Sequence, residues 1–328
     1  GSEMCIRDRI KEPPRGLSEG LISSESKNPL KETFKELVGL TPFGLVGSDN
    51  FKKELSINII FTVLIFLASY YLYVLTGDFL QWTAFGIGVY VICNWIHGLK
   101  NRDPVAFLLI FKSKALLLGL LSFPFITFVT YALGAFGPSF YIRNFSMTAT
   151  EVGIIYGLIT VFGSMIGVIC GGILGDKLRE TYVNGKLYLI MASAVLTGVT
   201  AIGFIHSENL VASFTWKFVY HIASTAWLGC AASTVTELVL PRLRAVASAF
   251  FILMLSMIGL ALGPYLPGMV RDIYIKSGLL PGPALKNAMT LTLVVLVLPF
   301  GLLAVACKYL KNDEAEIYEK ARSLGEEI

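Results

Sequence analysis

The sequence predicts an all-α membrane protein, a polytopic bundle of about eight transmembrane helices. Hydrophobic residues make up 55% of its 328 positions and charged residues only 15%, with a mean hydropathy of +0.68. Soluble domains carry roughly a quarter charged residues, so this composition excludes an ordinary soluble fold. Apolar stretches of about 20 residues, the length that crosses the hydrocarbon core, recur along the chain. Because backbone amides in lipid must be paired within their own segment, these stretches are expected to be helices.

The expected helices divide the chain into a connector, an initial pair, a six-helix bundle and a tail. In the connector, residues 10–54, Asn28 and Pro29 begin a short amphipathic helix expected on the membrane surface. The eight expected spans are Leu55–Leu75, Leu80–His97, Ala115–Gly134, Thr150–Leu174, Leu187–Ile205, Val211–Val239, Ala245–Leu266 and Ala288–Leu310. The domains that follow are the initial pair at 55–98, the six-helix bundle at 99–310 and a cytoplasmic tail at 311–328.

The first nine residues, GSEMCIRDR, have no evident structural role. Their reverse translation matches a transposase-type sequencing adapter read in frame, so residues 1–9 are interpreted as a library scar. On this interpretation the chain is an N-terminally truncated fragment, and fold reasoning starts at Ile10.

Basic residues predict which helix ends face the cytoplasm. The net charge of +4 is a mild excess of basic residues. In a membrane protein such an excess usually reflects basic residues in the cytoplasmic loops and does not indicate nucleic-acid binding. With the connector inside, most Lys and Arg residues of the loops fall on the inner side, and the outer side holds Arg143, Arg271, Lys276 and Lys286. We therefore expect both termini in the cytoplasm and the protein in a bacterial inner membrane.

Two of the expected helices carry glycines at four-residue spacing, which lets another backbone approach one face closely. The fourth span carries Gly163, Gly167, Gly171 and Gly175, and the seventh carries Gly259 and Gly263. A Gly-x-x-x-Asp pair ends each of the two helices: Gly172 with Asp176, which Lys177 follows, and Gly268 with Asp272.

The two glycine-lined spans are three spans apart and run in opposite directions. This relation predicts that spans three to five and six to eight are inverted repeats, the architecture of many secondary transporters. For the glycine line of the fourth span, a static pair of tightly packed helices is the alternative to a helix that moves, and the second glycine line in the seventh span favours movement.

Two long stretches resemble a known family. GAFGPSFYIRNFSMTATEVGIIYGLITVFGSMIGVICGGILGDKLRE resembles the seventh-to-eighth helix region of spinster-like members of the major facilitator superfamily. ELVLPRLRAVASAFFILMLSMIGLALGPYLPGMVRD is similar to their tenth-to-eleventh helix region, and EPPRG to the exit from their sixth helix. The resemblance covers roughly residues 103–272 and that short N-terminal match. Arg179 and Glu180 depart from the superfamily's loop motif, which has a Gly and a basic residue there.

The resemblance implies a twelve-helix secondary transporter of which this chain is the C-terminal half. The last six spans would be helices seven to twelve, the N-terminal half would be a missing partner, and the first two spans would be extra helices between the halves. The resemblance further implies alternating access around a midplane site in the lipid bilayer and a small organic substrate that is amphipathic or lipid-like. A proton gradient is the implied driving force, and no cofactor is implied.

Buried polar residues of spans three and six are the substrate-cavity candidates, because the resemblance makes these spans the cavity-lining helices seven and ten. Span six offers Lys217 and His221, about 9 and 15 Å inside the membrane, followed by Thr225. Lys217 alternatively snorkels to the outer surface, and His221 alternatively is satisfied by a neighbouring helix. Span three offers Thr127, Thr130 and Tyr131, whose hydroxyl groups line a cavity or bond back to their own helix.

Glu237 and Arg244 flank the loop after span six. They are interpreted either as a cytoplasmic gate pair or as separately solvated loop charges.

A membrane enzyme and a channel are the alternative functions. Catalysis needs converging groups, but His97, His206 and His221 are expected near the inner face, near the outer face and at mid-membrane, where they cannot share one metal ion. The sequence has no nucleophile elbow, phosphate loop or zinc spacing, and no channel filter repeat. We therefore expect a transporter, with neither an enzymatic nor a metal site.

Overall fold

The computed structural model describes Val38 and residues 51–323. Within these residues the chain is almost entirely helical and contains no strand, as the sequence predicts. Seven helical stretches of the described residues are long and apolar enough to cross a membrane, and two of them, Pro241–Lys276 and Pro281–Ala306, join shorter helices. The sixth expected span is not among the seven, because it is divided into two shorter helices. The expected adapter scar and the expected surface helix lie outside the described residues.

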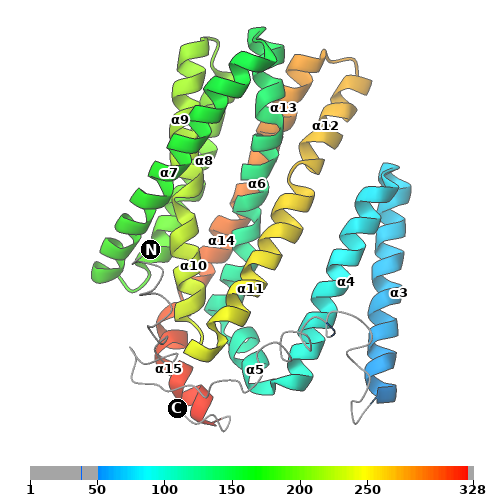
Figure 1. Cartoon of the computed structure of the whole chain (residues 1–328), viewed down its shortest axis with the longest axis vertical. Coiled ribbons are helices and arrows are strands. Elements are labelled where there is room, and N and C mark those ends of the chain that lie inside the picture. The colour runs from blue at the N-terminus through cyan, green and yellow to red at the C-terminus, as the bar shows by residue number, and fades with distance from the viewer. Residues whose placement is uncertain (1–37, 39–50, 324–328) are drawn as a thin grey trace, which may run out of the picture.

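The crossing helices alternate in direction between two ends of the molecule, named here the α15 end and the far end (Figure 1). A hairpin of α3 (Phe51–Thr76) and α4 (Phe79–Arg102) comes first. The first triplet consists of α6 (Lys114–Phe145), α7 (Ala149–Thr181) and α8 (Gly185–His206). The second triplet consists of α9 (Leu210–Thr225) with α10 (Trp227–Glu237), α11 (Arg244–Met254) with α12 (Tyr265–Lys276), and α13 (Pro281–Thr292) with α14 (Val297–Ala306).

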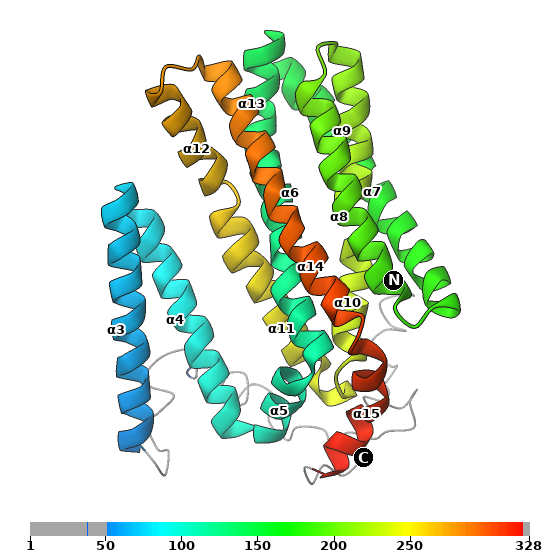
Figure 2. The ribbon, with the colours of Figure 1, turned by 180° about the vertical axis from the view of Figure 1, so that it is seen from behind.

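Two short helices at the α15 end were not expected from the sequence. The first, α5 (Pro104–Lys112), is an apolar helix of only nine residues between α4 and α6. The second, α15 (Leu310–Ser323), is a charged amphipathic helix in the segment expected to be a tail. Figure 2 shows both beside the ends of the crossing helices. Neither has the apolar length that identifies a span in a sequence.

Each crossing of the second triplet contains an interruption. At Ala226, α9 and α10 meet in helical geometry, so the sixth expected span consists of two helices of 16 and 11 residues. The π-helical segment η4 (Leu255–Leu260) joins α11 to the turn before α12, and the 3₁₀ segment η5 (Leu293–Leu296) joins α13 to α14. π-helical segments of this kind often occur at functional sites.

The triplets pack reciprocally. The third helix of each triplet packs on the first helix of the other, α8 on α9 and α14 on α6. The core between them is rich in aromatic side chains with almost no exposed surface, among them Phe123, Phe140, Tyr141, Phe204 and Tyr220. This arrangement agrees with two triplets that are related by inversion.

Asp103 fixes the corner between the α3–α4 hairpin and the bundle. Its Oδ1 atom accepts the backbone N–H of Ala106 at 2.8 Å, which caps α5, and its Oδ2 atom accepts Nη1 of Arg242 at 2.6 Å. Burial opposes ionisation of this carboxyl group, but the hydrogen bonds from Arg242 and Ala106 outweigh it and lower the pKa of Asp103. The contacts join α5 to the segment just before α11.

Replacing Asp103 with Ala is expected to lower the thermal unfolding temperature in detergent, because it removes a cap worth about 1 kcal/mol and the ion pair. Asp103→Asn keeps the cap and loses the charge, so its unfolding temperature should lie in between. A carboxyl group with a lowered folded pKa stabilises the fold above its unfolded pKa and loses this effect as the pH falls through the folded pKa. The gap between wild type and Asp103→Asn should therefore close on acidification, and a constant gap would contradict this assignment.

Candidate functional site

The glycine line of α7 lies against the backbone of α9 and α10. A Cβ atom built on Gly163 would lie 2.7 Å from Cβ of His221 and 3.1 Å from the carbonyl oxygen of Phe218. One built on Gly171 would lie 2.6 Å from the carbonyl carbon of Ala226. Real Cβ atoms are essentially never closer than 3.0 Å to such neighbours, so any larger residue would push the two helices apart. The two backbones therefore touch over about three helical turns.

The second glycine line makes the corresponding contact with α6. A Cβ atom on Gly259 would lie 2.8 Å from Cβ of Thr127, and one on Gly263 would lie 2.7 Å from the carbonyl oxygen of Phe128. Gly268 is looser, because its built Cβ atom would meet only the ring of Phe136, at 3.3 Å. Each glycine-lined helix thus packs on the first helix of the other triplet.

Adjacent glycines on α7 offer a matched test of this packing. Gly171→Ala is expected to destabilise the bundle strongly, because the methyl group meets main-chain atoms of Ala226 that cannot move aside. A Cβ atom on Gly172 meets nothing within 4 Å, and Gly costs a helix about 0.5–1 kcal/mol relative to Ala. Gly172→Ala should therefore leave the thermal unfolding temperature unchanged or raised. Equal effects of the two substitutions would contradict the close approach of α7 and α10.

Lys217 lies fully buried among aromatic rings from three helices. Its Nζ atom is 4.8 Å from the ring centroid of Tyr156 on α7, 4.3 Å from Phe204 on α8 and 4.4 Å from Tyr220 on its own helix. The ammonium group has no hydrogen-bond partner among the described residues. Ring faces attract a cation, and the attraction is stronger away from water. The expected alternative of snorkelling to the surface does not describe this structure.

His221 lies one helical turn from Lys217, at the contact between α9 and α7. Its Nε2 atom is 3.0 Å from Oγ1 of Thr160, whose own hydroxyl donates to the carbonyl oxygen of Tyr156 at 2.8 Å. Because that hydroxyl hydrogen is committed, Nε2 of a neutral His221 is assigned as the donor to Thr160. The imidazole is thus satisfied by a neighbouring helix, which is one of the two alternatives expected from the sequence.

The hydroxyl candidates occupy different positions. Thr127 and Thr130 of α6 donate to the carbonyl oxygens of Phe123 and Ile126, four residues earlier in each case. Thr225 likewise donates to the carbonyl oxygen of His221 at 2.8 Å. Tyr131 is different, because 44% of its surface is exposed on α6. Among these candidates only Tyr131 presents its side chain openly, so the six do not form one assembled pocket.

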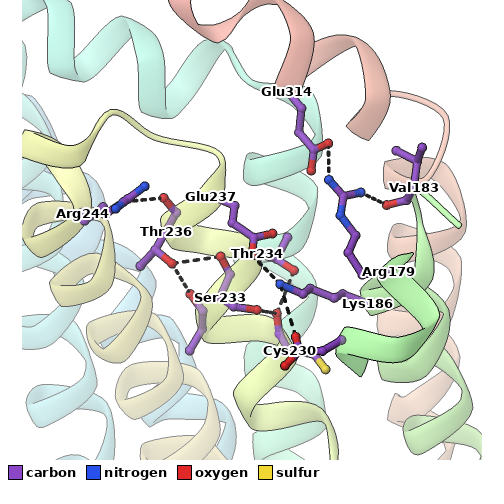
Figure 3. A network of polar contacts seen from close by, with 12 residues as sticks. Arg179, Val183, Lys186, Cys230, Ser233, Thr234, Thr236, Glu237, Arg244 and Glu314 are labelled. Atoms are coloured by element: carbon purple, nitrogen blue, oxygen red, sulfur yellow. Dashed lines mark hydrogen bonds and ion pairs between the residues drawn. The ribbon is translucent and has the colours of Figure 1, made fainter. Parts of the chain in front are cut away.

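A network of charges joins helices at the α15 end (Figure 3). Lys186, at the start of α8, is buried and pairs with Glu237 at the end of α10, and its Nζ atom is 3.8 Å from Oδ1 of Asp176 on α7. Arg244 donates from Nε to the carbonyl oxygen of Thr236 at 3.1 Å. Glu237 therefore has Lys186 as its partner, whereas the sequence suggested that Glu237 and Arg244 form a gate pair.

The helix α15, in the expected tail, contacts the bundle at the same end. Nη2 of Arg179 is 2.6 Å from Oε2 of Glu314, and Oδ2 of Asp313 accepts both the Ser113 hydroxyl at 2.9 Å and the Ala115 backbone N–H at 2.8 Å. Lys177 is exposed, and Asp272 at the far end is bonded by its neighbour Arg271. The two Gly-x-x-x-Asp ends therefore differ in their partners.

Several important residues were missed by the sequence reasoning. The rings of Tyr156, Phe204 and Tyr220 and the hydroxyl of Thr160 lay outside the candidate set. Tyr156 and Thr160 precede Gly163 by seven and three residues, so they share the glycine face of α7 and could have been found from that spacing. No comparable signal marks Phe204, because only the packing of α8 on α9 places it beside Lys217.

Comparison with known proteins gives several relatives. The chain is 30% identical over 201 residues to an MFS-type efflux pump of Mycolicibacterium smegmatis, a match that covers 60% of this chain and 45% of the pump. It is 25% identical over 177 residues to protein spinster of Drosophila melanogaster, covering 50% of this chain and 29% of that protein. No protein-family model matches the chain. The chain thus spans less than half the length of these relatives.

Solved structures agree on the fold. The crystal structure of a bacterial homologue of the human lysosomal transporter Spinster, inward-facing and unoccupied, superposes with a TM-score of 0.51 at 21% identity. The match covers 74% of this chain and 59% of that chain, and the occupied form gives a TM-score of 0.50 at 22% identity.

The fold is therefore that of the solved spinster homologue, a bundle of packed membrane helices. In sequence the chain is similar to an MFS-type efflux pump and to spinster proteins, so the resemblance predicted from its sequence is confirmed.

Proposed function

We propose that this protein is a secondary active transporter that works by alternating access and that residues 99–310 form its C-terminal six-helix bundle. The observation that carries the proposal is the reciprocal packing of the triplets, in which α7 lies on α9–α10 and the segment around η4 lies on α6. Inverted triplets packed in this way are the building unit of transporters that rock around a midplane site. The relatives named as a pump and as spinster proteins support the same class.

Backbone contact along both glycine lines gives the bundle the rigidity that rocking requires. A rigid bundle needs a second one to rock against, and the proposed partner is an N-terminal six-helix half, with α3 and α4 as extra helices between the halves. The relatives' greater length is consistent with such a partner. The substrate would then lie between the two bundles, within the lipid bilayer.

In the proposed substrate cavity, the exposed Tyr131 contacts the solute directly, and the adjacent half-buried Thr130 borders it. Thr225 lies apart from this surface, because its hydroxyl bonds within the contact of α7 and α9. Lys217 and His221 act from behind this surface, since both are buried where α7 and α9 meet. Both residues lie inside the bundle, so rocking of the bundle as a unit leaves the ring cage of Lys217 and the Thr160 contact of His221 in place. Both are proposed instead to respond to a solute bound at the surface in front of them.

The α15 end is proposed to face the cytoplasm of a bacterial inner membrane, with both termini on that side. Most loop Lys and Arg residues lie at this end, as the positive-inside rule requires. The proposed substrate is a small amphipathic or lipid-like organic solute, and the proposed driving force is a proton gradient. Catalysis is not part of the proposal, because the relatives are named as transporters.

Reconstitution into proteoliposomes tests the proposed function. The probes are a fluorescent lysophospholipid and a cationic amphipathic dye, each with and without an imposed proton gradient. A protein that contains this bundle and an N-terminal bundle is expected to give saturable, gradient-dependent flux of at least one probe, and this chain alone none. Conductance without saturation would favour a channel, and saturable flux by the chain alone would overturn the need for a second bundle.

The role of Lys217 can be separated from fold stability. Lys217→Met replaces a buried ammonium group by an apolar side chain of similar length, which commonly leaves stability unchanged or raised. If Lys217 acts in transport, this variant of the protein with both bundles should lose at least about tenfold in flux, a barrier change of about 1.4 kcal/mol, while its unfolding temperature holds. Lys308→Met, at an exposed position, is the matched control. Equal flux in both variants would remove Lys217 from the mechanism.

A further inference from the structure

The hairpin of α3 and α4 makes an ordered contact with the interrupted helix α11–η4–α12. The helix α4 runs in the opposite direction to α11–η4–α12 and packs along η4. In Figure 2 the hairpin stands beside the α11 and α12 ribbons, on the outer side of the bundle. The contact residues Gln81, Gly88 and Trp95 of α4 are seven apart, a spacing that keeps one face of a helix against a partner.

The contact includes specific bonds at several depths of the membrane. Near the α15 end, the ring of Trp95 stacks on Phe250 with a centroid separation of 5.0 Å. At mid-depth, Gly88 leaves room for the side chain of Met257, which a Cβ atom at position 88 would overlap. Further toward the far end, Nε2 of Gln81 donates to the carbonyl oxygen of Ala261 at 2.9 Å.

The last contact lies beyond the interruption. The hydroxyl of Tyr265 donates to Oδ2 of Asp78 at 2.6 Å, and its ring meets Trp82 edge-on at 5.3 Å. Asp78 immediately precedes α4, and Tyr265 begins α12. The hairpin therefore holds α11, η4 and α12 at once.

The interruption has the features of a joint. The N–H of Ala261 bonds to the carbonyl oxygen of Ser256, five residues earlier, which is π-helical pairing. Pro264 then lacks the N–H that would pair with Leu260 in a regular helix. Kinks occur at such π-segments and prolines, because fewer backbone hydrogen bonds resist bending there.

The hairpin itself is fastened by polar contacts between its two helices. Asn58 and Asn94, each only 5% exposed, are hydrogen-bonded to each other, and the hydroxyl of Tyr90 donates to Oδ1 of Asn58 at 3.1 Å. Glu54 pairs with His97 near the α15 end. Polar side chains of this kind hold membrane helices together where apolar packing gives no net preference over lipid.

We propose that the α3–α4 hairpin is an intramembrane splint, which bridges the joint at η4 and Pro264 and holds α11 and α12 at a fixed angle. An internally fastened hairpin that contacts both sides of a joint resists bending of the joint. Gln81 is the key positioning residue, because its amide bonds to main chain at the joint itself. Simple anchoring in lipid would need no such bond and no contact on both sides.

Hydrogen exchange of the protein in lipid nanodiscs tests the splint. Gln81→Ala should raise the exchange rate of the backbone amides of residues 261–263, 265 and 266 about threefold to tenfold, the effect of losing one hydrogen bond. Thr83→Ala, on the exposed face of the same helix, is the matched control and should leave these rates unchanged. Equal rates in both variants would overturn the proposal.

A second measurement keeps this result separate from misfolding and from the proposed transport function. With the native cysteines replaced by serine, Gly88→Cys and Met257→Cys should form a disulfide bond on mild oxidation. Thr83→Cys with Met257→Cys should not. No bond in the first pair, or equal bonding in both pairs, would show that α4 does not lie along η4.

Discussion

Contact between glycine backbones is the interaction on which the rest of this bundle depends. In lipid, burying apolar side chains brings little net gain, so helices associate through close van der Waals packing and polar contacts. The line from Gly163 to Gly175 brings α7 onto α9 and α10, and Gly259 and Gly263 bring the η4 region onto α6. The first helix of each triplet is thereby fixed by the second helix of the other.

This close approach also creates the unusual environment of Lys217. Because α7 and α9 touch, Tyr156 and Tyr220 reach the same volume, and α8 adds Phe204. An ammonium group enclosed by rings without a carboxylate partner is costly, and buried ionisable groups in membrane helices commonly mark function. The same helix contact gives His221 its partner Thr160. The strongest functional candidates are thus consequences of the glycine packing.

Much of the fold could be predicted because it depends on local sequence. Apolar length predicted the crossings, and glycine spacing identified the faces that meet. The helices α5 and α15 were missed because one is too short and the other too polar to register as a span. The division at Ala226 was also missed, because no Gly or Pro marks it in the sequence. The π-segment at η4 was missed because the Gly-Pro pair at 263–264 lies after it.

The candidate site was predicted less well because it depends on which helices become neighbours. Lys217 and His221 were identified from the resemblance of their span to a cavity-lining helix and from their depth in it, but their partners come from α7 and α8, far away in sequence. Lys186 illustrates the same point. It was placed among inner loop charges, whereas the packing of α8 beside α10 buries it and pairs it with Glu237.

Solid-state NMR of the protein in lipid bilayers tests the central contact most directly. With carbon-13 labelling, the account predicts through-space cross-peaks between Cα of Gly171 and the carbonyl carbon of Ala226, and between Cα of Gly263 and the carbonyl carbon of Phe128. Both should appear together, because each glycine line holds one helix of the other triplet. Absence of either cross-peak, in a spectrum that retains the sequential peaks of both helices, would contradict reciprocal packing of the triplets.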